Sequence, residues 1–159
     1  MKLFLVISDT HGDIFTAKDL IKMYPQINGI IHLGDFYKDA VILKTRFPDI
    51  EYFMVPGNCD FVFDTPTDVV IEVEGKRILI THGHRYDVKS SIGRLEAKAV
   101  TERVDAVLFG HTHIPYIEVR SQILFVNPGS LSHSRGSGAK TYVLLEVSSK
   151  GIEARGLDI

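Results

Sequence analysis

Two histidines separated by a single residue occur in the segment Gly110-His111-Thr112-His113, directly after an apolar run at residues 106–109. The apolar run predicts a buried strand, and side chains two residues apart along an extended backbone project to the same side. Two imidazoles held in this way are suited to share or flank a metal ion. Surface loops also carry His-X-His by chance, so the interpretation depends on what lies at the other strand ends.

Potential metal ligands also follow four earlier strand-like runs, and a glycine accompanies each of them. The complete set at the five predicted strand ends comprises Asp9, His11, Asp35, Asn58, His82, His111 and His113. Taken singly, each residue is explained as well by a turn, a helix cap or a hydrogen-bonded strand end. Taken together, carboxylate, imidazole and amide groups form a mixed nitrogen and oxygen set that suits first-row divalent metals. Since sites in α/β sheets form beyond the carboxyl ends of strands, we expect a metal site at this edge.

Strand-like and helix-like segments alternate through the first two thirds of the chain, which is typical of an α/β fold. Strands are expected at residues 3–7, 30–33 and 52–55, and helices at residues 14–24, with Asp13 as N-cap, and around 40–47. Later, Glu74-Gly75-Lys76 separates two strand-like runs, which predicts a β-hairpin. Further along we expect a helix at residues 90–103, strands at 106–109, 116–119, 123–126, 141–147 and 152–157, and a turn at 127–130. The hairpins suggest a second sheet packed against the first, with helices outside.

The composition predicts one folded domain, residues 1–159, because 45% of the residues are hydrophobic and 24% are charged, with no low-complexity tract. The net charge of −2 lacks the basic excess of a protein that tracks extended nucleic acid, although a single nucleotide still fits a local site. Cys59 is the only cysteine, so no intrachain disulfide is possible, as expected of a cytoplasmic protein. No apolar run approaches the roughly 20 residues that span a bilayer, so we expect a soluble protein without membrane contact. A homo-oligomer is compatible with this composition.

The same residues resemble the signature of the calcineurin-like metallophosphoesterase superfamily. That signature runs Asp-X-His, Gly-Asp, Gly-Asn-His-Asp/Glu, a lone histidine in Gly-His, and Gly-His-X-His, and its five blocks occur here in order between Asp9 and His113. The segment Asn127-Pro128-Gly129-Ser130 looks like the turn that follows in the small YfcE-like phosphodiesterase branch. The resemblance implies a four-layer α/β/β/α sandwich of two mixed sheets flanked by helices.

The resemblance also implies two divalent transition metal ions, of manganese, nickel, iron or zinc. Asp9, His11, Asp35 and His113 would bind the first ion, and Asp35, Asn58, His82 and His111 the second, with Asp35 bridging the two. Two metals roughly 3.5 to 4 Å apart hold a hydroxide between them, lower its pKa and clamp the phosphoryl oxygens during in-line displacement. The two divalent ions carry four positive charges, and two carboxylates and one hydroxide carry three negative ones. The resulting net charge of +1 matches the single negative charge of one phosphodiester. The implied function is therefore a phosphodiesterase acting on a small phosphodiester.

Two other functions remain open at this point. A phosphomonoesterase would use the same site on a different substrate. The metallophosphoesterase-fold subunit of retromer, which the chain also resembles, is a non-catalytic protein-interaction scaffold. A scaffold has no need of a complete ligand set, and this sequence keeps all seven ligand side chains in register, which favours an enzyme.

Cys59 stands where most of the superfamily has a histidine that is thought to contact the phosphate or protonate the leaving oxygen. A thiol with an ordinary pKa of about 8.5 is a poor cationic donor at neutral pH. A covalent role for the thiol is unneeded beside a metal-activated hydroxide. The candidate catalytic residues are Asp35, Asn58, Cys59 and His84.

The remaining basic residues have less specific interpretations. His84 lies two residues after an expected ligand, so it either lines the substrate pocket, supports a ligand from behind or is structural. His32 lies inside a strand-like run and is expected to be buried and hydrogen-bonded, whereas His133, in a loop rich in serine and glycine, is expected to be solvated. Arg85 and Arg135 are candidates for a phosphate contact, although surface exposure is the default for arginine.

Overall fold

The chain folds into two five-stranded sheets in a computed structural model that describes residues 1–132 and 138–159. The strand order of the first sheet is β10-β9-β1-β2-β3. Its strands are β1 (Lys2–Ile7), β2 (Gly29–His32), β3 (Glu51–Met54), β9 (Thr141–Ser148) and β10 (Gly151–Asp158). β1, β2 and β3 run parallel, whereas β9 pairs antiparallel with β1 and β10 antiparallel with β9. The first sheet is therefore mixed.

The second sheet is also mixed and has the strand order β4-β5-β6-β8-β7. Its strands are β4 (Asp68–Val73), β5 (Lys76–Thr81), β6 (Ala106–Leu108), β7 (Pro115–Arg120) and β8 (Ile123–Pro128). The predicted hairpin is confirmed by β4 and β5, whose turn places Glu74 and Gly75 at φ values of 52° and 76°. Two successive residues with positive φ match the twist of the flanking strands, and glycine adopts this conformation without strain.

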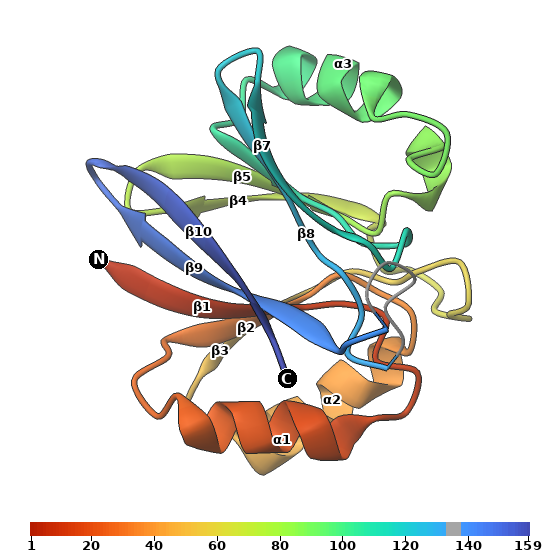
Figure 1. The fold of residues 1–159 in the computed structure, drawn as a ribbon, viewed down its shortest axis with the longest axis vertical. Coiled ribbons are helices and arrows are strands. Elements are labelled where there is room, and N and C mark those ends of the chain that lie inside the picture. The colour runs from red at the N-terminus through yellow and green to blue at the C-terminus, as the bar shows by residue number, and fades with distance from the viewer. Residues whose placement is uncertain (133–137) are drawn as a thin grey trace.

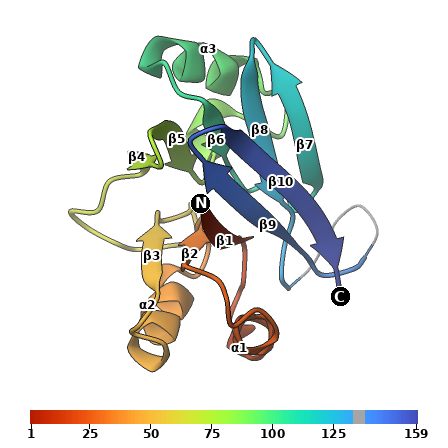
Figure 2. The ribbon, with the colours of Figure 1, turned by 90° about the vertical axis from the view of Figure 1, so that its left-hand side faces the viewer.

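Within residues 1–132 and 138–159, three α-helices cover the outer faces of the two sheets. They are α1 (Ile14–Met23), α2 (Tyr37–Arg46) and α3 (Gly93–Glu102), and a short 3-10 helix, η1 (His84–Tyr86), precedes α3. Figures 1 and 2 show α1 and α2 beside the first sheet and α3 beyond the second. As predicted, Asp13 caps α1, because its carboxylate accepts a hydrogen bond from the Thr16 amide over 3.2 Å.

Burial alternates along the strands in the way that a four-layer arrangement requires. On β1, Phe4 and Val6 pack into the apolar layer between the sheets, whereas Leu5 and Ile7 pack with residues of α1. On β5, Leu79 packs with residues of α3. The central strands of each sheet thus bury both faces, and the predicted α/β/β/α sandwich is confirmed.

The structure differs from the sequence expectation by one to three residues at several element boundaries, and local backbone pairing explains two of these differences. The third helix begins at Gly93 rather than at residue 90, because the Ser90 and Ser91 amides both donate to the Asp87 carbonyl and form a turn. β8 continues to Pro128, two residues beyond the expected strand end, because Asn127 and Pro128 remain paired with β7. The expected turn is thereby delayed until Gly129, whose φ is 76°.

The parallel strands bring the candidate ligands to one end of the sandwich. β5, β6 and β8 run parallel in the second sheet, as β1, β2 and β3 do in the first. Backbone hydrogen bonds join neighbouring strand ends: the Asp9 amide donates to the Gly34 carbonyl over 2.9 Å, and the Gly110 amide to the His82 carbonyl over 3.0 Å. Each sheet therefore presents its ligand-bearing segments side by side.

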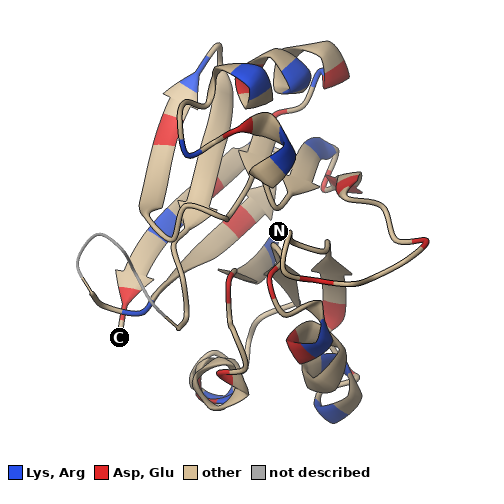
Figure 3. Ribbon diagram, turned by 90° about the vertical axis from the view of Figure 1, so that its right-hand side faces the viewer, with Lys and Arg blue, Asp and Glu red and all other residues tan. Residues whose placement is uncertain are grey.

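Charged segments are distributed over the whole fold. In Figure 3, Lys and Arg segments (blue) are interspersed with Asp and Glu segments (red) along both helices and strands. Among the residues that the structure describes, no helix is both long and apolar enough to cross a lipid bilayer.

Candidate metal centre

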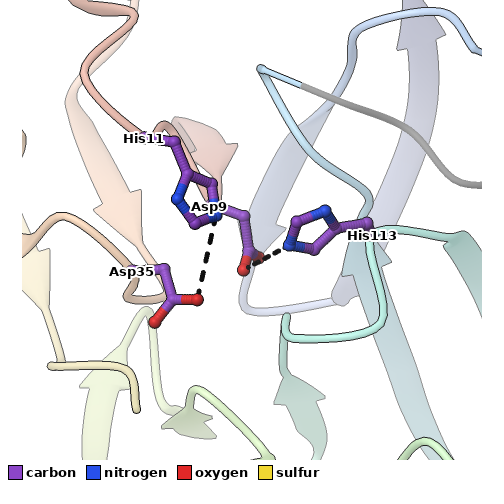
Figure 4. A group of neighbouring side chains, drawn as sticks. All are labelled: Asp9, His11, Asp35 and His113. Carbon is purple, nitrogen blue, oxygen red and sulfur yellow. Dashed lines mark hydrogen bonds and ion pairs between the residues drawn. The ribbon is translucent and has the colours of Figure 1, made fainter. Parts of the chain in front are cut away.

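Asp9 lies at the centre of the site, just after β1, and its side chain is fully buried. Its Oδ2 accepts hydrogen bonds from the Ser8 hydroxyl and, over 3.2 Å, from the His111 amide. Its Oδ1 lies 3.0 Å from His113 Nε2, and a dashed line in Figure 4 marks this contact. Burial alone would raise the pKa of Asp9, but the hydrogen bonds with His113 and the Ser8 hydroxyl counter it, and the pKa is lowered. Asp9 is therefore an ionised carboxylate held on both oxygens.

Asp35 is the second carboxylate, placed just after β2 and only 3% exposed. Its Oδ1 accepts a hydrogen bond from the Cys59 amide over 3.0 Å. The backbone of Gly57 passes so close that a Cβ atom there would lie 2.1 Å from the same oxygen, so glycine is required at that position. The third strand end is thus packed directly against the Asp35 carboxylate.

His82 is completely buried at the end of β5, and its two ring nitrogens have different surroundings. Nδ1 lies 2.6 Å from the Leu33 carbonyl, which only accepts hydrogen bonds, so Nδ1 carries a proton. Nε2 faces three oxygens: Asn58 Oδ1 at 3.1 Å, Asp35 Oδ1 at 3.5 Å and Asp9 Oδ1 at 3.9 Å. With the proton on Nδ1, His82 Nε2 carries a lone pair that faces three acceptor oxygens. A cation placed between Nε2 and these oxygens would stabilise the group. This donor arrangement fits a bound metal ion.

A second group of ligand atoms adjoins the first. One ligand atom from each of Asp9, His11, Asp35 and His113 lies within 4.8 Å of the others. Figure 4 shows the two histidines and the two carboxylates pointing toward a common centre. His11 Nε2 is buried without a hydrogen-bond partner and lies 3.8 Å from Asp35 Oδ2. A buried nitrogen that lacks a partner beside a carboxylate is the state expected of a metal ligand.

His111 completes the set from the end of β6. Its ring centroid lies 5.1 Å from that of His82. Burial, followed by repulsion from His82 and Lys89, lowers the pKa of His111 to about 4. The imidazole is therefore neutral at neutral pH, which is the form that binds metals.

The backbone at the site is strained. Positive φ values between 46° and 70° occur at five candidate ligands: Asp9, His11, Asp35, His111 and His113. Side chains other than glycine seldom adopt this conformation, and strain of this kind persists where the surrounding structure enforces it, commonly at functional sites. The strained turns direct consecutive ligands of each loop toward the same point.

The structure thus brings together all seven residues that the sequence singled out as candidate ligands. Cys59 lies beside them, exposed, and burial together with the Asp35 carboxylate raises the pKa of its thiol. The His84 ring packs 5.4 Å from the His82 ring and 6.1 Å from the His111 ring, and burial followed by repulsion from His82 lowers its pKa. His84 is accordingly a neutral group behind two candidate ligands.

The other basic residues are placed as follows. Arg85 is exposed and donates to the Thr67 hydroxyl over 2.9 Å. His133 and Arg135 lie outside the described residues. His32 is completely buried and hydrogen-bonded, as the sequence predicted.

A buried polar network behind the site was not predicted from the sequence. The Gly34 amide donates to His32 Nδ1 over 3.2 Å, so Nε2 carries the proton and donates to the Thr10 hydroxyl over 3.1 Å. The Thr10 hydroxyl donates in turn to Asp39 Oδ2 over 2.6 Å, and the Gly12 amide donates to the same oxygen over 2.8 Å. Burial lowers the pKa of His32 to about 4, in keeping with a neutral ring. The network ties the loop after β1 to the end of β2.

Hydroxyl and amide groups from the end of β8 and beyond also hold the site loops. The Ser130 and Ser132 hydroxyls donate to the Asp9 carbonyl over 2.9 and 3.0 Å. The Asn127 side chain donates to the Gly110 carbonyl over 2.9 Å. From the sequence, these residues were predicted only to lie in or near a turn. The one signal for a supporting role is that this turn forms a sixth strand-end loop at the same edge of the sheets.

Comparisons of the sequence and of the structure with known proteins point to the same family. The sequence matches the calcineurin-like phosphoesterase superfamily domain over residues 1–150. The probable metallophosphoesterase YsnB of Bacillus subtilis is 32% identical over 156 residues, covering 97% of this chain and 89% of YsnB. Phosphodiesterase YfcE of Escherichia coli is 28% identical over 171 residues, covering 92% of this chain and 88% of YfcE. A solved structure of a predicted phosphoesterase from Streptococcus pneumoniae matches with a TM-score of 0.79 and 26% identity, covering 99% of this chain and 98% of that one.

Proposed function

Because the chain belongs to the calcineurin-like phosphoesterase superfamily, we propose that it is a phosphodiesterase that depends on two divalent transition metal ions. The observation that carries the proposal is the position of His82 Nε2, which faces Asn58, Asp35 and Asp9 oxygens between 3.1 and 3.9 Å away. The second ion would occupy that position, and the first would lie among the group that includes the unpartnered His11 nitrogen. Manganese, nickel, iron and zinc all suit this mixture of nitrogen and oxygen donors.

The convergence of the ligand atoms supports the assignment of ligands that the family resemblance implies. Asp9, His11, Asp35 and His113 would hold the first ion, and Asp35, Asn58, His82 and His111 the second. Asp35 is the bridging ligand in this scheme because its Oδ2 lies nearest His11 and its Oδ1 nearest His82. Bound ions would provide a water-derived nucleophile at neutral pH and would neutralise charge on the phosphoryl oxygens.

The contribution of the chain itself is to fix these ligands before substrate binds. The Leu33 carbonyl sets the tautomer of His82, and the Cys59 amide holds Asp35. Ser8 and the His111 amide hold Asp9. Ligands that are held by such partners keep their orientation when the metal binds. The His84 ring, packed against two candidate ligand rings, has the same positioning role.

Diesters are favoured over monoesters by two observations. The relative YfcE is named a phosphodiesterase. In this chain, the position that would place a cationic histidine beside the phosphate is occupied by Cys59, whose raised pKa keeps the thiol neutral.

A non-catalytic scaffold offers no reason for the strained backbone at five candidate ligands.

The experiment that tests the proposal combines metal analysis with turnover. The purified protein, incubated with manganese, nickel, iron or zinc, is expected to retain two ions per chain and to hydrolyse bis(4-nitrophenyl) phosphate, and a chelator should abolish both. Each ion, at about 100 times its Kd, should stabilise the folded chain by about 2.7 kcal/mol and so raise Tm by about 5 to 10 °C. Absence of bound metal and of hydrolysis with all four ions would favour the scaffold.

A further inference from the structure

A groove opens directly beside the candidate metal centre, between α2 and the loop that joins β3 to β4. It has a volume of about 460 Å³ and is lined mainly by apolar side chains: Phe36, Val41, Ile42, Cys59, Phe61 and Val62. Phe36 follows the proposed bridging ligand Asp35 in sequence, and Cys59 follows Asn58. The groove therefore begins at residues adjacent to two candidate metal ligands.

We propose that this groove binds a planar aromatic group on the ester arm of the substrate that is not the leaving group, with Phe61 as the residue that stacks on it. This inference rests on the proposed function, because it is the phosphate of the substrate that the metal centre would hold. The substrate class is thereby narrowed to phosphodiesters that carry an aryl group or a nucleobase.

The size and lining of the groove fit one ring system. Binding sites for small molecules commonly enclose about 300 to 1,000 Å³ and are lined by apolar and aromatic side chains. A volume of about 460 Å³ is at the lower end of that range. The two charged residues of the lining already have partners: the Lys38 ammonium lies 5.0 Å from the centre of the Phe36 ring, and Asp60 accepts hydrogen bonds from backbone amides. The groove thus favours a neutral ring over a charged group.

Phe61 is 93% exposed in a chain that buries most of its large apolar side chains. An aromatic ring that stays exposed to water does not gain the favourable free energy of burial. A ligand that covers both the ring and the apolar groove would supply that free energy on binding. Phe63, two residues later on the same loop, is 86% exposed but does not line the groove. The pair therefore supplies both a candidate stacking residue and a matched control.

The base of the loop is fixed, so the position of Phe61 is defined. Asp60 Oδ1 accepts a hydrogen bond from the Tyr37 amide over 2.9 Å, and its Oδ2 accepts one from the Gly57 amide over 2.8 Å. These bonds join the loop to the first turn of α2. On the opposite wall, Phe36 has a φ of 68°, which is rare for a bulky residue, and its ring lies 5.0 Å from the His11 ring. Local strain thus places an aromatic side chain between the groove and the metal centre.

The test uses three diesters that share a 4-nitrophenyl leaving group and a single negative charge: the methyl, phenyl and thymidin-5′-yl esters of 4-nitrophenyl phosphate. The metal-loaded wild type should hydrolyse at least one of the two aromatic esters about tenfold better than the methyl ester, by kcat/KM. Phe61→Ala should remove most of that preference and leave the methyl ester within twofold of wild type. Phe61→Tyr, which keeps the ring, and Phe63→Ala should behave like wild type.

The outcomes separate the possible sources of the ring. A preference for the phenyl ester alone identifies aryl esters as the substrates, and a preference for the thymidine ester identifies nucleotides. An aromatic preference that is the same in wild type and Phe61→Ala, or that Phe63→Ala reduces equally, would overturn the proposal.

A binding measurement distinguishes failure of this inference from failure of the proposed function. Methyl(phenyl)phosphinate and dimethylphosphinate are monoanions that cannot be hydrolysed, and their Kd values for the metal-loaded protein are measurable by calorimetry. If no ester is hydrolysed but Phe61→Ala weakens only the phenyl compound by about five- to tenfold, the groove is supported and the catalytic proposal fails. Equal binding of the phenyl compound by wild type and Phe61→Ala rejects the groove whether or not the protein is an enzyme.

Discussion

The two sheets contribute different chemistry to the edge at which they meet. The first sheet supplies both carboxylates, the amide of Asn58 and one histidine, whereas the second supplies only histidines: His82, His111 and His113. Negative charge is therefore concentrated on one half of the candidate site and neutral nitrogen donors on the other. Contacts cross the seam between them, with His113 Nε2 3.0 Å from Asp9 Oδ1 and His82 Nε2 3.5 Å from Asp35 Oδ1.

The two halves are also supported differently. The first-sheet loops are braced by a buried polar network of Thr10, His32 and Asp39. The second-sheet loops are held by the Asn127 side chain, which donates to the Gly110 carbonyl, and their histidines also contact the first half, as the Leu33 carbonyl does with His82. The difference indicates that the first half sets the geometry and charge of the centre, and that the second half completes the coordination.

Asp35→Ala should have the largest effect of any single ligand replacement. The proposed bridge touches both ions, so its loss should weaken both sites together and lower kcat/KM by about 10³-fold or more. His113→Ala, which removes one second-sheet ligand of one ion, should cost less, about 10- to 100-fold. Metal content per chain and bis(4-nitrophenyl) phosphate turnover measure both.

The exposed Asp19, on α1, provides the control for a lost carboxylate, and Asp19→Ala should retain both ions and full turnover. A variant at Asp35 that keeps one tight site and most of its turnover would show that the bridge is assigned wrongly. Equal losses at Asp35 and His113 would remove the functional distinction between the two halves.

The location of the site was predictable because parallel strands end at one edge. Asp9 and His113 are 104 residues apart, yet each follows a predicted buried strand, and the fold places them 3.0 Å apart. Features that depend on contacts between distant parts of the chain were not predicted from the sequence. Asp39 lies on a helix, where an exposed acid is the default, and only tertiary packing buries it against Thr10. The left-handed backbone at residues such as Asp9 also depends on contacts that are remote in sequence.

The exposed aromatic loop was missed for a related reason. Phe61 and Phe63 alternate with other residues in a manner that a buried strand shares, so their types alone indicate burial rather than exposure. Asp60 precedes them, and its carboxylate holds the base of the loop by accepting hydrogen bonds from the Tyr37 and Gly57 amides. Such side chain to backbone bonds across distant segments are set by the fold as a whole.

His32 should make the support of the first half sensitive to acid. Its pKa is about 4 in the folded chain because of burial and about 6.5 in an unfolded one, so the unfolded state binds more protons between these values. The contribution of His32 to stability is therefore fully present above about pH 6.5 and is lost as pH falls toward 4, by up to about 3 kcal/mol. Denaturant unfolding of wild type at a series of pH values measures this loss.

The matched variant is His32→Gln, which keeps a hydrogen-bond donor toward Thr10 but has no group that titrates in this range. The difference in unfolding free energy between wild type and His32→Gln should shrink or reverse as pH falls from 6.5 to 4, because only wild type loses stability through this residue. Parallel pH curves for the two proteins would mean that the pKa of His32 is the same in the folded and unfolded chains, so that burial does not lower it.

Cys59 is the position at which the first half departs from the family pattern, and its effect concerns substrate choice. A monoester near neutral pH carries close to two negative charges, so it binds best where a nearby cation compensates the extra charge. Burial and the Asp35 carboxylate raise the pKa of the Cys59 thiol, which keeps it neutral. Arg85 is engaged with the Thr67 hydroxyl, and His84, whose pKa is lowered, is neutral as well.

We therefore expect the wild type to hydrolyse bis(4-nitrophenyl) phosphate better than 4-nitrophenyl phosphate, by kcat/KM at fixed pH and metal. Cys59→His should narrow or reverse that gap by about two- to tenfold, because it adds a donor and partial positive charge beside the phosphate. Cys59→Ser, which is small and neutral, should keep the wild-type ratio. A wild type that prefers the monoester would contradict the charge argument. An unchanged ratio in Cys59→His would mean that position 59 does not set the preference, and that the carboxylates of the first half and the ions they hold determine it alone.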